Sequence, residues 1–445
     1  MAQLAHVGFW RRLRRVGIVL GGAIGLVATL LTLHAVYKNR LSLAVFLVEV
    51  SSIVLVAFLC VVVARYALLI WFAWLQHVEH MTDPFEADEH PFVTVIVPAY
   101  NEGKVIVSSV RSLMDMDYPH FEVLVVDDGS SDDTFERAQS LVAVFGETRL
   151  RVLSQANGGK ATALNTGIAA ARGEIVLCMD GDSLLEPQTL REAVKHFADP
   201  TVGAVAGNVK VANRLNALTR LQALEYIEGL SLVRTAHAFF RRVVVIPGPI
   251  GLFRKSVIAE VGGYLRDTFA EDCELTLRIM AAGWKVKYES RAVAWTEAPE
   301  TLDSLFKQRY RWSRGILQAV LKHRSRLGRP GPDVLDWAFL WVLVFEAVIW
   351  PAMNVFAIFF FIAVGLWAGV GSLVVLWWAQ LTVLDIVAAM FCVSLEQEDL
   401  KLTWYAALYR LYFIPLIDVI KLFASLDELL GVGMGWGKLE RLGRI

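Results

Sequence analysis

Four aspartates follow two of the short β-branched runs in this chain. Asp127 and Asp128 come after one run, and Asp180 and Asp182 come after another, separated by Gly181. In extended backbone, residues two apart point the same way, so Asp180 and Asp182 can address one hard cation. Such a cation would neutralise the charge of a departing diphosphate. Asp127 or Asp128 could accept hydrogen bonds from a base or a ribose, or this region could cap the next helix.

A second set of residues stands where helices are predicted to begin. Gly158, Gly159 and Lys160 open one helix, and backbone N–H groups beside a lysine favour an anionic ligand. The glycine-to-lysine spacing of a P-loop is absent. Glu271 and Asp272 open another helix. A carboxylate there could act as general base on an acceptor hydroxyl, or it could serve only the helix dipole.

The stretch Thr301–Lys322 presents an amide, a cationic fork and a large ring. In a helix, Gln308, Arg311 and Trp312 are three or four positions apart and project from one face. The guanidinium of Arg311 suits a diphosphate, and the ring of Trp312 suits the apolar face of a sugar. Because a long apolar run follows, we expect this helix to lie along a membrane surface.

Alternating strands and helices must position these residues. The alternation predicts right-handed βαβ units and a mostly parallel sheet, in which ligands bind at the carboxyl ends of the strands. The first strand ends in Ala99, Tyr100 and Glu102, which can present backbone and polar side chains to a flat ligand. The predicted strands are Phe92–Pro98, Phe121–Asp127, Leu150–Ser154 and Glu174–Met179, and the predicted helices are Val105–Met114, Asp132–Phe145, Lys160–Ala171 and Pro187–Phe197.

The composition is that of a membrane protein with a soluble domain. Of the 445 residues, 56% are hydrophobic and 20% are charged, below the soluble average of about 25%. The net charge of −1 gives no indication of nucleic-acid binding. The four cysteines are scattered without a CxxC pair, which argues against a disulfide framework or a zinc site.

Two apolar runs precede the central region, and each is long enough to span a bilayer. They are Val16–Val36 and Leu43–Leu75. The arginines before the first run predict a cytoplasmic N-terminus, although the basic link between the runs opposes this orientation. A cleaved signal peptide is the alternative. Two spans would return the chain to the cytoplasm before the nucleotide-binding domain begins.

Three further apolar runs follow the central region: Ala338–Trp367, Val374–Leu395 and Tyr405–Leu426. The last contains Arg410, Asp418 and Lys421, so it either faces a bundle interior or a water-filled path, or lies on the membrane surface as an amphipathic helix. The number of spans stays open, because five would place the basic tail outside whereas its charge favours the inside. The expected segments are two N-terminal transmembrane helices (1–80), a nucleotide-binding domain (81–300), interfacial helices (301–335), a C-terminal transmembrane bundle (336–430) and a basic tail (431–445).

Taken in order, these residues resemble the signature of processive family 2 glycosyltransferases. The acidic pairs and the sequence QRYRW (308–312) are similar to the D, DxD, TED and QxxRW motifs of cellulose, chitin, hyaluronan and poly-N-acetylglucosamine synthases. The resemblance covers about Pro91 to Lys322. The length, the leading spans and the sequence GNVKVANR (207–214) look most like bacterial poly-β-1,6-N-acetylglucosamine synthases. Ala270 stands where Thr is commoner, and Pro249 differs from several relatives, so the acceptor pocket could differ.

The resemblance implies a GT-A type fold. This is an α/β domain with a mostly parallel, Rossmann-like sheet, inserted on the cytoplasmic side between transmembrane helices. It also implies that Asp272 is the catalytic base, with Glu271 beside it, and that Asp180 and Asp182 bind Mg²⁺ or Mn²⁺. Trp312, together with Asp272, would bind the acceptor. The residues implied in binding the nucleotide sugar are Ala99, Tyr100, Glu102, Asp127, Asp128, Lys160, Asp180, Gln308 and Arg311.

The activity implied is that of an inverting, processive β-glycosyltransferase in the bacterial inner membrane. It would polymerise a UDP-sugar, first of all UDP-N-acetylglucosamine, into an exopolysaccharide and extrude it. Its partners would be the UDP-sugar, the growing polysaccharide and the lipid bilayer, and a small membrane accessory protein or a second copy of the chain stays open.

Three alternatives remain at this point. One is a β-glucan, chitin-like or hyaluronan-like synthase, and another is a non-processive enzyme that glycosylates a lipid carrier. The third is a transporter or receptor that only senses a nucleotide, which would not need Asp272 together with the DxD motif.

Overall fold

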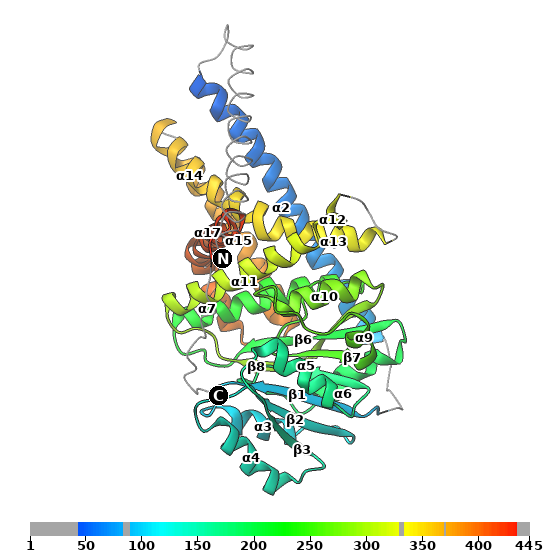
Figure 1. The fold of residues 1–445 in the computed structure, drawn as a ribbon. Coiled ribbons are helices and arrows are strands. Elements are labelled where there is room, and N and C mark those ends of the chain that lie inside the picture. Colours follow the sequence, from blue (N-terminus) through cyan, green and yellow to red (C-terminus); the bar gives the residue numbers. More distant parts are fainter. Residues whose placement is uncertain (1–42, 83–89, 329–332, 369–370, 434–445) are drawn as a thin grey trace, which may run out of the picture.

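The structure is a computed structural model that describes residues 43–82, 90–328, 333–368 and 371–433. A domain built on one sheet lies at one end, and a group of long helices lies at the other (Figure 1). α11 (Leu302–Lys322) runs along the boundary between the two. The expected span Val16–Val36 and most of the basic tail lie outside the described residues.

The sheet has eight strands in the order β3-β2-β1-β4-β7-β6-β8-β5. β3, β2, β1 and β4 are parallel, β7 is antiparallel to both of its neighbours, and β6 and β8 are again parallel. The predicted, mostly parallel sheet is therefore confirmed. The strands are β1 (Val93–Ala99), β2 (Phe121–Asp127), β3 (Leu150–Ser154), β4 (Ile175–Cys178), β5 (Ser183–Leu185), β6 (Val202–Val211), β7 (Gly251–Arg254) and β8 (Lys285–Thr296).

Helices cover both faces of this sheet and create one apolar core on each side. α3 and α4 contribute to one core, and α5 and α10 contribute to the other. Every residue of β1 and β2 is buried, which explains why these strands are nearly continuous apolar runs. The helices of the domain are α3 (Ile106–Met114), α4 (Thr134–Phe145), α5 (Lys160–Ala170), α6 (Thr189–Val194), α7 (Ala217–Glu225), α8 (Leu232–Phe239), α9 (Lys255–Glu260) and α10 (Glu271–Ala281).

Three helical stretches of the described chain are long and apolar enough to cross a membrane. They are Val48–Glu79, Val334–Ala363 and Trp378–Leu395. The first belongs to α2 and the third to α15, whereas the second joins α13 to α14 through the π-helical segment η3. The bounds of these elements are α2 (Leu43–Thr82), α13 (Val334–Val344), η3 (Phe345–Ile349), α14 (Trp350–Ala368) and α15 (Gly371–Leu395).

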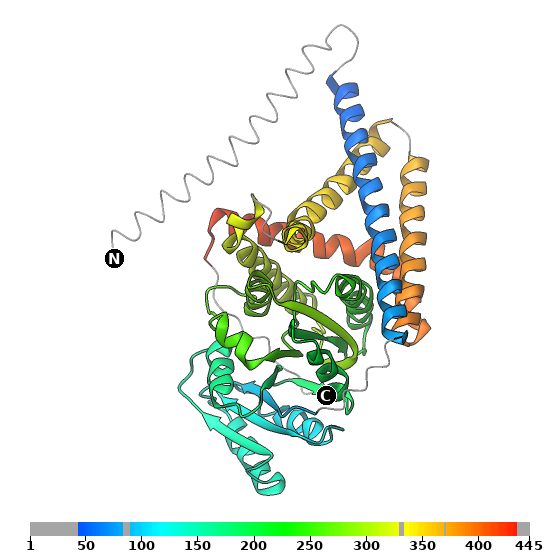
Figure 2. The same ribbon diagram turned by 90° about the vertical axis from the view of Figure 1, so that its right-hand side faces the viewer.

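The last expected apolar run, Tyr405–Leu426, is not among these three stretches. It begins in 3₁₀- and π-helical turns and continues as α17 (Ile414–Leu430), which lies crosswise to α2 and α15 (Figure 2). This orientation agrees with the alternative of a helix along the membrane surface. Arg410 is buried, and its Nη2 lies 2.6 Å from Oδ1 of Asp385 in α15, so a polar partner inside the bundle neutralises its charge.

Two glutamates that follow α15 attach the bundle to the sheet domain. Glu396 Oε2 accepts a hydrogen bond from Asn208 Nδ2 of β6 at 2.6 Å. Glu398 accepts from both Nη atoms of Arg214, at 2.6 and 3.1 Å, and Nζ of Lys210 lies 3.2 Å from its carboxylate. We call these five residues the α15–β6 clamp. The clamp fixes β6 against the membrane-side helices.

Candidate active site

The carboxyl ends of the strands face a cavity of about 660 Å³. The cavity extends from these strand ends to Leu343, Glu346 and Ile417 of the membrane-side helices. The predicted site residues that line it are Ala99, Tyr100, Glu102, Asp128, Lys160, Asp180, Asp182, Glu271, Asp272, Gln308, Arg311 and Trp312. Asp127 does not line the cavity, and its Oδ2 accepts a hydrogen bond from Ser154 Oγ at 3.2 Å. The structure therefore brings all but one of the predicted residues together.

Asp128 shapes the turn before α5. Its Oδ1 accepts hydrogen bonds from the side-chain amide of Gln155 at 2.7 Å and from the backbone N–H of Gly158 at 2.9 Å. Its Oδ2 accepts from the N–H of Gly159 at 2.7 Å. Gly159 has a φ of 83°, a conformation that favours glycine. In this structure the carboxylate of Asp128 thus holds the turn that places Lys160 at the start of α5.

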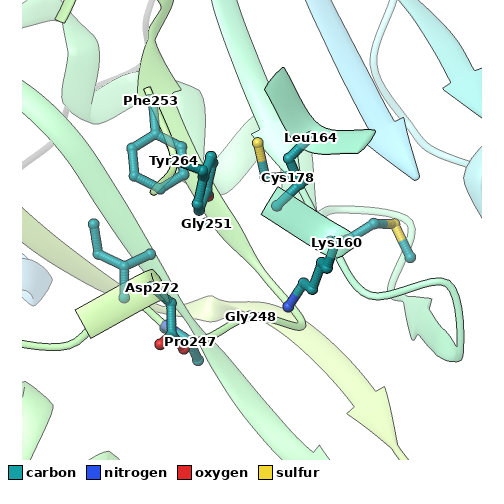
Figure 3. Close-up of a pocket in the computed structure, with 11 residues that line it drawn as sticks. Lys160, Leu164, Cys178, Pro247, Gly248, Gly251, Phe253, Tyr264 and Asp272 are labelled. Carbon is teal, nitrogen blue, oxygen red and sulfur yellow. The ribbon is translucent and has the colours of Figure 1, made fainter. Parts of the chain in front are cut away.

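Lys160 links two of the acidic motifs. Its Nζ lies 2.6 Å from Oδ1 of Asp180 and 3.1 Å from Oε1 of Glu271. Burial alone would lower the pKa of Lys160, but the charges of Asp180, Glu271 and Asp272 outweigh this effect and raise the pKa. Figure 3 shows the lysine reaching toward the loop that holds Gly248, with Asp272 on the other side of that loop. A cation therefore sits among the carboxylates where a diphosphate is expected.

Asp272 lies in the first turn of α10 and lines the cavity. Its Oδ1 accepts a hydrogen bond from the N–H of Cys273 at 2.7 Å. Burial and the charge of Glu271 raise the pKa of Asp272 to about 6, although Lys160 opposes them. A carboxyl group with a pKa near 6 is well suited to take a proton near neutral pH.

If Asp272 is the general base that the resemblance implies, we expect the kcat/KM of sugar transfer to fall about tenfold per pH unit below the pKa of about 6. Only the ionised carboxylate of Asp272 can accept a proton, so the active fraction decreases as the pH falls through this pKa. The measurement is the initial rate of nucleotide release at donor concentrations well below KM, between about pH 5 and pH 8 with saturating Mg²⁺. Glu271→Gln should move the inflection to lower pH, because it removes a neighbouring negative charge. A rate that stays flat down to about pH 5 would contradict this assignment.

α11 brings its three predicted side chains to the cavity. Thr301 caps the helix by accepting a hydrogen bond from the N–H of Ser304 at 3.3 Å. From this start, Gln308, Arg311 and Trp312 all project into the cavity, as their spacing predicted. Arg309 supports the ring of Trp312, with its guanidinium carbon 4.2 Å from the ring centroid. Its charge is balanced by Glu225, 2.5 Å away.

Gly315 sets how closely α11 approaches the start of α10. A Cβ atom at this position would lie 2.5 Å from the backbone nitrogen of Ala270 and 2.7 Å from the carbonyl carbon of Phe269. Only glycine permits this contact without moving the backbone. The helix of Trp312 and the turn of Asp272 are therefore held together as one unit.

Several cavity residues carry no signature in the sequence. They lie toward the membrane and are Glu225, Arg234, His237, Glu346 and Lys421. These residues come from four separate helical segments and belong to none of the motifs, so no motif identifies them. The signal available is the position of Glu346 and Lys421 inside long apolar runs, because ionisable residues in such runs usually have a function.

Asp180 and Asp182 are the residues that fit a divalent metal ion. Both line the cavity, and Gly181 between them lies against the end of β1, where a Cβ atom would be 2.8 Å from the carbonyl oxygen of Pro98. Within the described chain, no group of three or more acidic, histidine or cysteine side chains forms a ready-made metal site. Two carboxylates suit Mg²⁺, which usually takes its remaining ligands from substrate phosphates and water.

The fold and the site together define an α/β domain with acidic and basic side chains clustered at its strand ends, joined to helices that are long and apolar enough to cross a membrane. Residues 90–315 match the sequence model of the family described as glycosyltransferase like family 2, and the chain belongs to this family. The protein is therefore a glycosyltransferase, as the resemblance implied.

Curated relatives confirm the resemblance that the motifs indicate. The poly-β-1,6-N-acetyl-D-glucosamine synthase of Staphylococcus aureus is 33% identical over 240 residues, which cover 53% of this chain and 57% of that protein. The synthase of Staphylococcus epidermidis is 30% identical over 233 residues, with 52% and 56% covered. The match therefore spans little more than half the length of these relatives.

A solved structure confirms the GT-A type fold. The mannosyltransferase PcManGT of Pyrobaculum calidifontis, solved with GDP-mannose and Mn²⁺, superposes with a TM-score of 0.60 at 23% identity. The superposition covers 82% of this chain and 99% of that chain. At this identity the likeness concerns the fold alone.

Proposed function

We propose that this protein is a processive, inverting β-glycosyltransferase that polymerises a UDP-sugar, UDP-N-acetylglucosamine first, into an exopolysaccharide and extrudes it across a bacterial inner membrane. The observation that carries the proposal is the continuity of the cavity. It runs from the strand ends with Lys160 and Asp180, past Asp272 and Trp312, to Glu346 at the membrane side. A polymer that leaves through the membrane needs such a path next to the transfer site.

The proposed reaction is a single displacement at the anomeric carbon of the donor. Asp272 takes the proton of an acceptor hydroxyl, whose oxygen forms the new bond as the bond to the diphosphate breaks. Lys160 and Arg311 stabilise the negative charge on the departing UDP. Asp180 and Asp182 would hold Mg²⁺ or Mn²⁺, which supplies further positive charge to the diphosphate. Attack from the opposite face inverts the anomeric centre, so an α-linked donor yields a β-linked polymer.

The nucleotide end of the cavity is assigned to the uracil and ribose. Ala99, Tyr100 and Glu102 at the end of β1 would contact them directly. Asp127 and Asp128 would support this end, since their carboxylates accept hydrogen bonds from Ser154 and from the Gly158–Gly159 turn. Gln308 and Arg311 would contact the diphosphate from α11. Glu271 would keep Lys160 in place.

The path of the cavity supports a proposed placement of each segment relative to the membrane. The catalytic domain is cytoplasmic, α11 and α17 lie at the membrane surface, and α2, α13, α14 and α15 cross the membrane. The lipid bilayer and the growing polysaccharide are the expected partners. A small membrane accessory protein or a second copy of the chain could complete the exit path on the membrane side.

Trp312→Ala should shorten the product. The indole ring would lose its contact with the acceptor sugar, so we expect the acceptor to bind roughly tenfold more weakly. Hydrolysis of the donor by water should fall much less, because the ring does not contact the nucleotide in this proposal. Polymer length by gel filtration and UDP release, measured on the same samples, separate the two. Equal losses of both would contradict a role in acceptor binding.

The deciding experiment uses the full chain in lipid nanodiscs with Mg²⁺. UDP release and polymer size are measured with UDP-N-acetylglucosamine, UDP-glucose, UDP-glucuronic acid and UDP-galactose, and the products are treated with linkage-specific hydrolases. Long polymer from UDP-N-acetylglucosamine alone, resistant to chitinase, supports the proposal. Polymer from another donor, or from a pair of donors, would assign a different synthase, and a single transfer to a lipid carrier would exclude a processive enzyme.

Extrusion requires a separate measurement. The protein is reconstituted into sealed vesicles with its catalytic domain outside, and polymer is made from external donor. Polymer that resists an added hydrolase until detergent opens the vesicles has crossed the membrane. Polymer that is digested at once would mean that the enzyme releases its product on the catalytic side.

A further inference from the structure

Arg234 is a buried cation in the membrane-side part of the cavity. It belongs to α8 and lines the cavity close to His237. The side chain is only 9% exposed. Within the described chain, no atom accepts a hydrogen bond from its Nη1, and no carboxylate forms an ion pair with it. Arg309 in the same cavity differs, because Glu225 lies 2.5 Å from its guanidinium.

A buried guanidinium is destabilising unless a ligand supplies the missing hydrogen-bond acceptor. Burying a guanidinium without a partner removes its hydration and puts no protein hydrogen bond in its place. Burial accordingly lowers the pKa of Arg234, although the charge of Asp272 and the hydroxyls of Tyr288 and Tyr226 oppose this effect. A buried donor without a partner that faces a cavity therefore indicates a ligand oxygen in that cavity.

The position of Arg234 indicates that its ligand is the acceptor sugar and not the nucleotide-sugar donor. α8 packs along α2, and the rings of Phe72 and Phe239 from the two helices stack 5.4 Å apart. Arg234 thus lies on the membrane side of Asp272, whereas Lys160 and Asp180 lie at the nucleotide side. The oxygen that meets Arg234 belongs to the molecule that receives the sugar.

The charge of the cavity limits the chemistry of that molecule. Among the described residues that line it, nine are Asp or Glu and five are Lys or Arg. His237 adds no positive charge at neutral pH, because burial lowers its pKa to about 4. The excess lies at the nucleotide end, whereas on the membrane side Glu225 and Glu346 balance Arg234 and Lys421. This part of the cavity therefore has no net positive charge to hold an acceptor with a carboxylate. A neutral acceptor is favoured, and the strongest neutral hydrogen-bond acceptor on a sugar is the carbonyl oxygen of an acetamido group.

We propose that Arg234 binds the acceptor sugar by donating a hydrogen bond from Nη1 to the carbonyl oxygen of its acetamido group. The inference rests on the proposed function and makes Arg234 a residue that determines specificity for the acceptor. It explains why a cation is kept without a protein partner, since the polymer itself supplies the acceptor oxygen. It also predicts that recognition of the acetamido group is separate from recognition of the nucleotide.

The test compares Arg234→Met with the wild type in nanodiscs. Methionine keeps much of the apolar length of the side chain and removes the charge. Binding of two uncharged oligosaccharides is measured calorimetrically without donor: a β-1,6-linked trimer of N-acetylglucosamine and a β-1,6-linked trimer of glucose. We expect the wild type to prefer the acetylated trimer and the variant to lose roughly ten- to a hundredfold of this preference, the value of a hydrogen bond to a charged group. Arg234→Lys keeps the charge but not the planar guanidinium, so it should lose part of the preference for the acetylated trimer.

The same samples provide the controls. UDP binding should change less than twofold or so in Arg234→Met, because the nucleotide lies elsewhere. The Tm without ligand should be equal to or higher than that of the wild type, since the change removes an uncompensated buried charge. Arg137→Met, at a half-exposed position on α4, is the matched control and should change neither trimer binding nor UDP binding.

Three results would overturn the inference. They are an unchanged preference for the acetylated trimer, a loss of UDP binding, and a lower Tm, which would show that Arg234 is structural. Failure of the proposed function would look different. In that case no sugar nucleotide would give UDP release with the wild type, whatever the trimers show.

Discussion

Asp272→Asn is expected to lower the rate of polymer synthesis by a factor on the order of 10²–10⁴ and to leave UDP binding intact. Asparagine has nearly the same shape as aspartate, so the turn at the start of α10 should persist, including the hydrogen bond from the N–H of Cys273. The amide, however, cannot take a proton from the acceptor hydroxyl. The loss should therefore appear in turnover, and the affinity for UDP should not change.

The measurement combines UDP release with calorimetric UDP binding on the full chain in nanodiscs. Asp267→Asn is the matched control, because the same chemical change there affects a largely exposed carboxylate that pairs with Lys322. A loss of only about tenfold in Asp272→Asn would be too small for a general base. A loss of UDP binding would show that Asp272 holds the nucleotide or the fold.

Gly315→Ala is expected to reduce turnover by a factor on the order of 10², although it adds a single methyl group. The new Cβ atom would lie 2.5 Å from the nitrogen of Ala270 and would force α11 away from the turn of Asp272. A displacement of about 1 Å in a catalytic arrangement can produce such a loss. Helix propensity alone predicts the opposite, because alanine stabilises the interior of a helix by about 1 kcal/mol relative to glycine.

Gly328→Ala is the control for this substitution. A Cβ atom at Gly328 meets open space, and its φ of −80° suits any residue. Activity and Tm of both variants are measured together, and Gly328→Ala should match the wild type in both. Full activity in Gly315→Ala would mean that the approach of α11 to α10 does not position the site.

The sequence predicts most of the sheet domain because its signals are local. The strands with Val93–Ala99 and Phe121–Asp127 are apolar runs that end in polar residues, and helical spacing alone places Gln308 and Trp312 on one face. Position in the chain therefore indicates position at the cavity. The extra strands β5 to β8, each of which takes part in an antiparallel pair, have weaker patterns and were not predicted.

Other features depend on contacts between distant segments, which one sequence does not reveal. The carboxylate of Asp128 accepts hydrogen bonds from the turn of the next βα unit. Arg234 reaches the cavity because α8 packs along α2. The run Tyr405–Leu426 is apolar enough to be taken for a span, yet it starts in 3₁₀ and π turns. Its orientation depends on partners such as Asp385, which holds Arg410.

The α15–β6 clamp affects how this enzyme can be truncated or recombined. A fragment cut to the family domain, residues 90–315, would lose Glu396 and Glu398 and leave Lys210 and Arg214 with no described carboxylate. Such a fragment would not be a faithful stand-in for the intact enzyme. A chimera that moves the domain to another membrane scaffold would have to carry the end of α15 with it. The smallest portable unit is thus discontinuous in the chain.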